Sequence, residues 1–257
     1  IALLKDDLLI AYLGKVLPLA QVGYIGFAQK WAFMPLRLIM DNVIRITFPS
    51  FSRLQDHKDL LAKAVERSIF ASAFIVFPSL IGLVIMSPYF IQIIPKYSKW
   101  EPALVSLVFF ALNACFSSVS TPLTNALNAI GKIKISLYLM VFWTIATWAL
   151  TPALIIIMGF NGVGVASFII SLSAVFVVFL VKRYIDFNIF PIFYPLAASL
   201  VMGFLIYILM LMLTVSAYSI FIGIVLGAIL YFALILMMAK KLVLADIRLV
   251  IENIFKK

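Results

Sequence analysis

The chain has 257 residues, of which 65% are hydrophobic and 12% are charged, and its mean hydropathy is +1.19. About a quarter of the residues of soluble globular domains are charged, so this composition excludes such a domain and predicts an all-α polytopic membrane protein. A transmembrane barrel is excluded because its strands alternate apolar and polar residues, whereas the apolar runs here are continuous.

The chain begins with Ile1 and lacks the basic segment and small-residue cleavage site of a signal peptide. We therefore expect it to start within or just before a helix that ends near Leu13, with an earlier part of the protein missing. Asp6 and Asp7 lie in this first segment. They are either carboxylates for ion coupling or for pairing with Lys30, or they are solvated at the cytoplasmic mouth.

The second segment, residues 21–47, has the length of a membrane span but carries Lys30, Arg37, Asp41 and Arg45. These four positions fall within about a quarter turn of one helix face. A charge at the bilayer centre costs about 2.5 to 3.5 kcal/mol. Asp41 could pair with both arginines at i±4 while Lys30 reaches the outer interface. The surplus of cations favours instead a cationic lumen that binds an anion, above all phosphate.

Uncharged stretches downstream predict six further crossings. They cover residues 68–95, 102–131, 135–158, 163–181, 192–213 and 218–239. Together with the two earlier segments they make about eight transmembrane helices. We expect the tail, residues 240–257, to be amphipathic and to lie on the membrane surface.

The crossing at 102–131 contains an unusually polar stretch around Pro122. Its polar residues are Asn113, Ser117, Ser118, Ser120, Thr121, Asn125 and Asn128. Hydrogen bonding between helices is the preferred explanation, and contact with sugars is the alternative.

The distribution of Lys and Arg predicts the orientation of the chain. Fifteen of the 20 cations fall in one set of alternate loops and termini, three fall in the opposite set, and Lys30 and Arg37 remain inside the membrane. The loop at 50–63, the turn at 131–134 and the C-terminus are therefore expected to be cytoplasmic. The net charge of +10 then reflects topology, and we expect no nucleic-acid partner.

Catalytic and metal-binding patterns are lacking in the sequence. One histidine (His57) and one cysteine (Cys115) are too few for a zinc or iron site or a disulfide framework. There is no Walker-type glycine loop and no serine–histidine pair. We therefore expect a protein that is not an enzyme and has no cofactor or metal.

Several motifs resemble those of the Wzx-type oligosaccharide flippases, of the superfamily that includes multidrug exporters and the lipid II flippase. The most specific motif is Phe48-Pro-Ser-Phe-Ser-Arg-Leu-Gln55, which follows the Gly23-Tyr24 pair and Pro35. Supporting motifs are the helix at 78–87, Lys99-Trp-Glu-Pro-Ala103 and Asn128-Ala-Ile-Gly-Lys132. At Ile94-Pro-Lys96 the chain departs from the family, which commonly has a Phe-Gly pair there.

The resemblance implies the second lobe of a two-lobe flippase plus two trailing helices. Residues 1–186 would form the six-helix C-terminal lobe, residues 187–239 the two additional helices, and residues 240–257 a cytoplasmic tail. It further implies a multi-pass protein of the inner (plasma) membrane. Such a protein would move a polyprenyl-pyrophosphate-linked oligosaccharide across the membrane by alternating access. The oligosaccharide would be used to build lipopolysaccharide or other cell-envelope polysaccharides. Lys30, Arg37 and Arg45 would bind the pyrophosphate or acidic sugars, and Asp41 would position the arginines. Membrane lipid, a first lobe and an ion gradient are the other implied partners.

Three alternatives remain. An ion-coupled drug or metabolite extruder of the same superfamily would have a net acidic cavity. A non-transporting membrane scaffold would bury its charges in pairs. A membrane glycosyltransferase or ligase would need a carboxylate site in a large outer loop, and no loop here exceeds about twenty residues.

Overall fold

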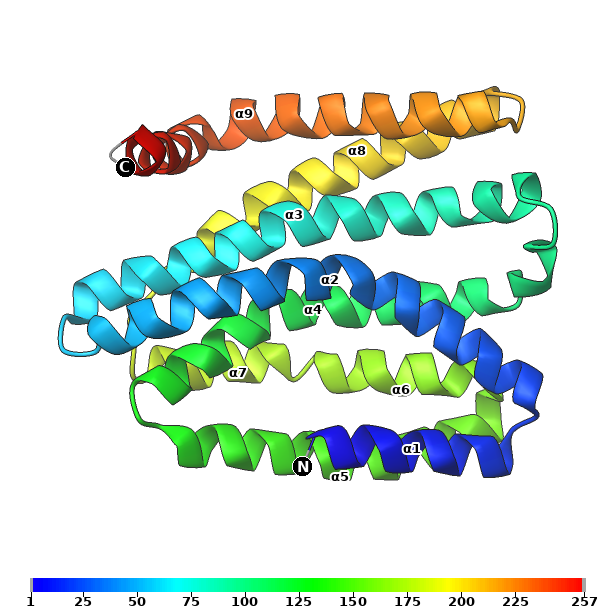
Figure 1. Ribbon diagram of the computed structural model, residues 1–257, viewed down its shortest axis with the longest axis horizontal. Helices are drawn as coiled ribbons and strands as arrows, with labels where there is room; N and C mark the ends of the chain where they lie inside the picture. The colour runs from blue at the N-terminus through cyan, green and yellow to red at the C-terminus, as the bar shows by residue number, and fades with distance from the viewer. Residues whose placement is uncertain (1, 256–257) are drawn as a thin grey trace.

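The computed structural model describes the backbone of residues 2–255 and the side chains of residues 7–40, 43–45 and 47–239. Throughout this part the regular structure is helical, and most of the helices run back and forth in antiparallel rows (Figure 1). The all-α membrane fold predicted from composition is confirmed.

The helices follow the predicted crossings in order. They are α1 (Ala2–Val16), α2 (Leu19–Arg53), α3 (Lys58–Ile93), α4 (Ala103–Ala129), α5 (Ile133–Met158), α6 (Asn161–Ser171), α7 (Ala174–Lys182), α8 (Phe193–Met212) and α9 (Ala217–Phe255), with short 3-10 helices η1 (Ser98–Trp100) and η2 (Phe190–Ile192).

Six segments of the described chain are long and apolar enough to cross a membrane, and they match the six uncharged stretches. They are Lys58–Ile93, Ala103–Ala129, Ile133–Met158, Asn161–Lys182, Phe190–Met212 and Ala217–Ala239. Helix α2 has 35 residues but carries the charged stripe, and α1 has 15 residues, fewer than the roughly 20 that a span needs. Crossings by α1 and α2 therefore stay predictions.

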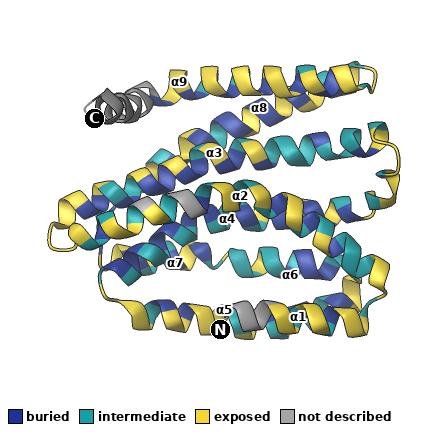
Figure 2. Cartoon of the chain, in the orientation of Figure 1, coloured by how far each residue is buried: buried dark blue, intermediate teal, exposed yellow. Residues whose placement is uncertain are grey.

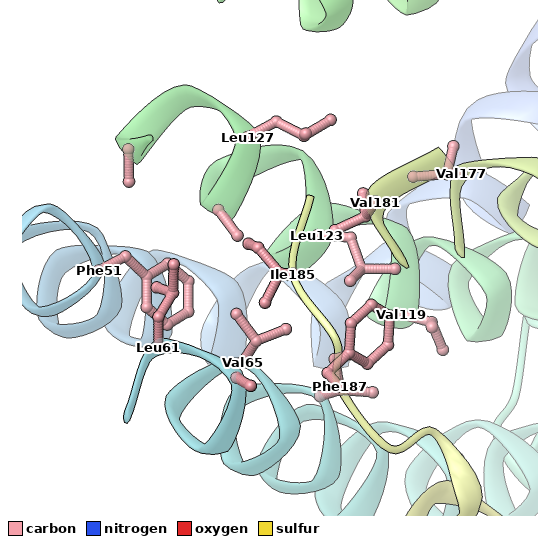
Figure 3. Close-up of a cluster of buried hydrophobic side chains, with 14 of the residues drawn as sticks. Phe51, Leu61, Val65, Val119, Leu123, Leu127, Val177, Val181, Ile185 and Phe187 are labelled. Carbon is pink, nitrogen blue, oxygen red and sulfur yellow. The ribbon is translucent and has the colours of Figure 1, made fainter. Parts of the chain in front are cut away.

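The loop expected over residues 50–63 is much shorter in the structure. Helix α2 continues to Arg53 and α3 begins at Lys58, so four residues connect them. Charged residues such as Lys, Arg and Glu have a high helix propensity, so a helix can continue beyond the bilayer. Hydropathy alone does not detect this continuation. Phe51 and Leu61, at the ends of the two helices, are 0% and 2% exposed and belong to one apolar cluster (Figure 3). This packing extends both helices beyond the apolar spans.

The crossing predicted at 163–181 is interrupted. Between α6 and α7 the backbone switches to tighter bonds, in which Ser173 N–H donates to the Ile170 carbonyl and Val175 N–H donates to the Leu172 carbonyl, both at 3.1 Å. The Trp143 indole Nε1–H of α5 donates to Ser173 Oγ at 2.8 Å and braces this break. Irregular backbone at membrane depth is tolerated where it lines a cavity or is buried in protein.

Helices α8 and α9 pack on α3, and Figure 2 shows a buried strip along this contact. Pro78 has no N–H, so the carbonyl of Phe74 four residues earlier loses its helical donor. The hydroxyl of Tyr231 on α9 donates to this carbonyl at 2.7 Å. The division of the chain at residues 186 and 239 stays a prediction. Helix α9 kinks at Ala239, where the predicted tail begins, and the side chains of that tail lie outside the described residues.

Candidate functional site

A polar cavity of about 550 Å³ lies between α1, α2, α4, α5 and the break between α6 and α7. Its wall on α2 is Gln29, Phe33, Leu36 and Arg37, and α1 closes one side with apolar residues. The polar residues contributed by the other helices are Asn113, Ser117, Ser120, Thr121, Thr124, Thr147, Ser167, Ser171 and Ser173. A cavity with so many hydroxyl and amide groups is unusual for a helix bundle in a membrane, because polar groups there are costly without a partner.

Arg37 contributes a guanidinium to the wall of this cavity. Leu36, the residue before Arg37 on α2, is buried in an apolar cluster that includes residues of α4. This packing holds the turn of α2 that carries Arg37. A guanidinium offers five donors in a planar fork, which suits a phosphate or a carboxylate.

The polar face of α4 forms another wall of the cavity. Asn113 Nδ2 donates to the Ser167 carbonyl at 3.2 Å and its Oδ1 accepts from Ser117 Oγ at 3.0 Å. Thr124 Oγ1 donates to the Ser120 and Thr121 carbonyls at 3.1 and 2.9 Å. Hydrogen bonding between and within helices is thus present as expected. Asn113, Ser117, Ser120, Thr121 and Thr124 also line the cavity, and contact with sugars stays a prediction.

Of the predicted charged stripe, the structure describes the side chains of Lys30, Arg37 and Arg45. Arg37 lines the polar cavity. All three are exposed, and Lys30 and Arg45 are not part of the cavity wall. The side chains of Asp41 and of Asp6 lie outside the described residues, while Asp7 is exposed. The joint role of the stripe stays a prediction.

Sequence reasoning missed Gln29, Trp143 and the serines of the α6–α7 break. Ser167 and Ser171 are four residues apart and therefore share a face of α6, a signal visible in the sequence. Gln29 lies two turns before Arg37 on α2. Its amide is neutral, so a search for charged residues did not find it. No sequence pattern indicated that Trp143 would donate to Ser173 across 30 residues.

A second cavity, of about 420 Å³, is an apolar groove between α3, α8 and α9. Its lining includes Gly82, Met86, Met202, Gly203 and Phe232. Among the described residues, no group of three or more histidine, cysteine or acidic side chains is placed to bind a metal ion.

Comparison with known proteins shows similarity to polysaccharide biosynthesis proteins. Residues 2–105 match the family described as "Polysaccharide biosynthesis protein". The chain is 26% identical over 153 residues to the lipopolysaccharide biosynthesis protein WzxC of Escherichia coli (strain K12), covering 60% of this chain and 30% of WzxC. It is also 26% identical over 122 residues to a membrane protein in the cps region of Klebsiella pneumoniae, covering 48% of this chain and 25% of that protein.

The fold is that of the lipid II flippase MurJ in its inward closed conformation, with a TM-score of 0.74 at 19% identity. The match covers 87% of this chain and 48% of MurJ, and the chain thus spans about half or less of the proteins that it matches. The helices and the fold define a multi-pass membrane protein with the fold of MurJ. The sequence matches confirm the resemblance to the Wzx-type polysaccharide biosynthesis flippases.

Proposed function

We propose that this chain is part of a flippase that moves a polyprenyl-pyrophosphate-linked oligosaccharide across the inner membrane by alternating access. The observation that carries the proposal is the polar cavity of about 550 Å³ with Arg37 in its wall. Such a cavity accepts the part of the substrate that lipid cannot solvate, namely the phosphates and the sugars.

Arg37 binds the pyrophosphate in this proposal, because a bidentate contact between guanidinium and phosphate is among the strongest polar contacts available. Lys30 and Arg45, on the same helix, guide the anion toward and away from Arg37, and Asp41 positions the arginines. A first lobe completes the cavity, which is consistent with a match to 48% of MurJ. The C-terminus lies in the cytoplasm, and an ion gradient drives the cycle.

An extruder of cationic drugs is the nearest alternative. It needs carboxylates at its binding site, and the described lining of the polar cavity contains an arginine and no Asp or Glu. A scaffold that does not transport is disfavoured because it has no use for a cavity of this size lined by hydroxyls.

Reconstitution of the full-length protein into proteoliposomes tests the role of Arg37. The variant Arg37→Gln keeps a polar side chain that can still donate hydrogen bonds but removes the positive charge. We expect it to slow flipping of a fluorescent polyprenyl-pyrophosphate oligosaccharide about ten- to a hundredfold, the usual worth of a charge-assisted hydrogen bond. Arg183→Gln, which removes an exposed cation after α7, is the control and should flip normally. Unchanged flipping by Arg37→Gln would refute the proposal.

A further inference from the structure

The polar side chains of the cavity fall into two groups by their hydrogen bonds. Most are already engaged: Ser117, Thr124 and Thr147, for example, donate to a neighbouring side chain or to their own helix. The side chains of Gln29, Ser120 and Thr121 line the cavity and make no hydrogen bond to any described residue. All three are half-buried.

Unsatisfied polar groups within a membrane protein are stable only where water or a ligand satisfies them. Ser120 and Thr121 are adjacent on α4, and Thr121 is one turn from both Ser117 and Thr124 on the same polar face. Gln29 is on α2, eight residues or about 12 Å before Arg37 along the helix. The unengaged groups therefore lie on two walls of the cavity that also contains the guanidinium.

We propose that Gln29, Ser120 and Thr121 recognise uncharged hydroxyl groups of the glycan while Arg37 binds the adjoining pyrophosphate. This inference rests on the proposed function and assigns glycan specificity to three further side chains. Hydroxyls and a carboxamide can both donate and accept hydrogen bonds, as sugar hydroxyls do. A site that is built to hydrogen-bond a ligand hydroxyl discriminates strongly against a ligand that lacks it.

The chemistry of these walls also restricts the sugar that they accept. The described lining near Ser120 and Thr121 contains hydroxyls and amides but no lysine, and its one arginine is Arg37. A uronic acid beside these two residues would be desolvated without a cation of its own, because the pyrophosphate occupies the guanidinium. The structure thus favours a neutral sugar next to the pyrophosphate.

Three probes separate this inference from the function on which it rests. They are polyprenyl pyrophosphate alone, the same lipid with a neutral disaccharide, and the same lipid with a disaccharide that contains a uronic acid. Binding to the full-length protein in lipid nanodiscs is measured for each. We expect the wild-type protein to bind the neutral glycolipid more tightly than the acidic one.

The informative variant is Thr121→Val, which removes one hydroxyl and keeps the shape of the side chain. We expect it to weaken binding of the neutral glycolipid about three- to tenfold, which corresponds to the loss of one hydrogen bond. Binding of polyprenyl pyrophosphate alone should not change. Ser120→Ala is a second variant with the same expected pattern. Thr144→Val, on α5 outside this lining, is the matched control, since Thr144 Oγ1 donates to its own helix at Met140 O, 2.8 Å away.

The possible outcomes distinguish a failure of the glycan inference from a failure of the proposed function. Both variants are first shown to be folded by their elution profile and melting curve. If Thr121→Val and Ser120→Ala then bind the neutral glycolipid as the wild-type protein does, the glycan inference is overturned. Equal binding of neutral and acidic glycolipids by the wild-type protein overturns the preference for a neutral sugar. Retained binding of polyprenyl pyrophosphate by Arg37→Gln overturns the proposed function and not merely its extension.

Discussion

The two cavities of this molecule have similar volumes, about 550 and 420 Å³, but opposite chemistry. The polar cavity combines hydroxyls, amides and one guanidinium with apolar side chains, among them those of α1. The groove between α3, α8 and α9 is lined almost entirely by apolar side chains and glycines. The groove lies between three helices that are apolar enough to span a membrane, whereas α1 and α2 of the polar cavity are not among the candidate spans.

The two regions are also held together differently. Around the polar cavity, side chains bond across helices, as Asn113 does to α6 and Trp143 does to the α6–α7 break. Around the groove, shape dominates, and α8 approaches α3 closely at Gly203. One polar contact, from Tyr231 to Phe74, joins α9 to α3. Substitutions that remove hydrogen bonds and substitutions that add volume should therefore have different effects in the two regions.

The largest effect is expected from added volume at the groove. In Gly203→Ala the new Cβ would lie 2.5 Å from Ile81 Cγ2 and 3.0 Å from Ile85 Cδ1. Branched isoleucine side chains are stiff, so α8 must shift away from α3. Overpacking outweighs the gain in helix propensity, and we expect a net loss of about 1 to 2 kcal/mol in SDS-induced unfolding.

Gly82→Ala is the matched control on the other wall of the groove. No atom lies within 4 Å of its added Cβ, and the residue is helical. Its unfolding free energy should stay constant or rise by up to about 1 kcal/mol, because alanine favours the helix. Equal destabilisation by both variants would show that the groove is not held by close packing at Gly203.

A smaller effect is expected from a lost hydroxyl at the polar cavity. Ser173→Ala removes the acceptor of the Trp143 indole N–H and leaves this donor unpaired at the α6–α7 break. We expect the free energy of unfolding in SDS to fall by about 1 kcal/mol. This is at the lower end for an unsatisfied donor, because water that enters the cavity can bind the indole N–H.

Ser79→Ala in the apolar groove is the comparison for this variant. Ser79 Oγ donates only to the Ile75 carbonyl of its own helix, at 2.7 Å. Without this hydroxyl, the Ile75 carbonyl keeps its hydrogen bond within the helix. The expected change in the free energy of unfolding is therefore close to zero. A result in which Ser79→Ala costs as much as Ser173→Ala would contradict the difference drawn between the two regions.

The sequence was sufficient to predict the helices because each span is an independent run of apolar residues. It placed six spans correctly and located the turn before Asn161 from its glycines. It failed where packing, not hydropathy, decides: Phe51 and Leu61 extend α2 and α3 through a contact between the two helices. The α6–α7 break was also missed, because neither glycine nor proline marks it and its brace comes from Trp143.

For the site, the joint role predicted for Lys30, Arg37, Asp41 and Arg45 from their formal charges stays a prediction. Arg37 lines the polar cavity, whereas Lys30 and Arg45 do not. Helix α2 passes several neighbours along its 35 residues, so one stripe can face different surroundings. The hydroxyls of α4 were noticed, but only the fold shows that Ser120 and Thr121 line the same cavity as Gln29 and Arg37 of α2.

The smallest expected effect concerns the polar contact that joins α9 to α3. Tyr231→Phe removes the hydroxyl that donates to the Phe74 carbonyl, which Pro78 has deprived of its helical donor. Hydrogen bonds between transmembrane helices average about 0.6 kcal/mol, and we expect a loss of this size in SDS-induced unfolding. Tyr207→Phe, at an exposed position of α8, should change nothing. A loss of several kcal/mol for Tyr231→Phe would mean that this hydrogen bond, rather than the shape of the groove, holds α9 on α3.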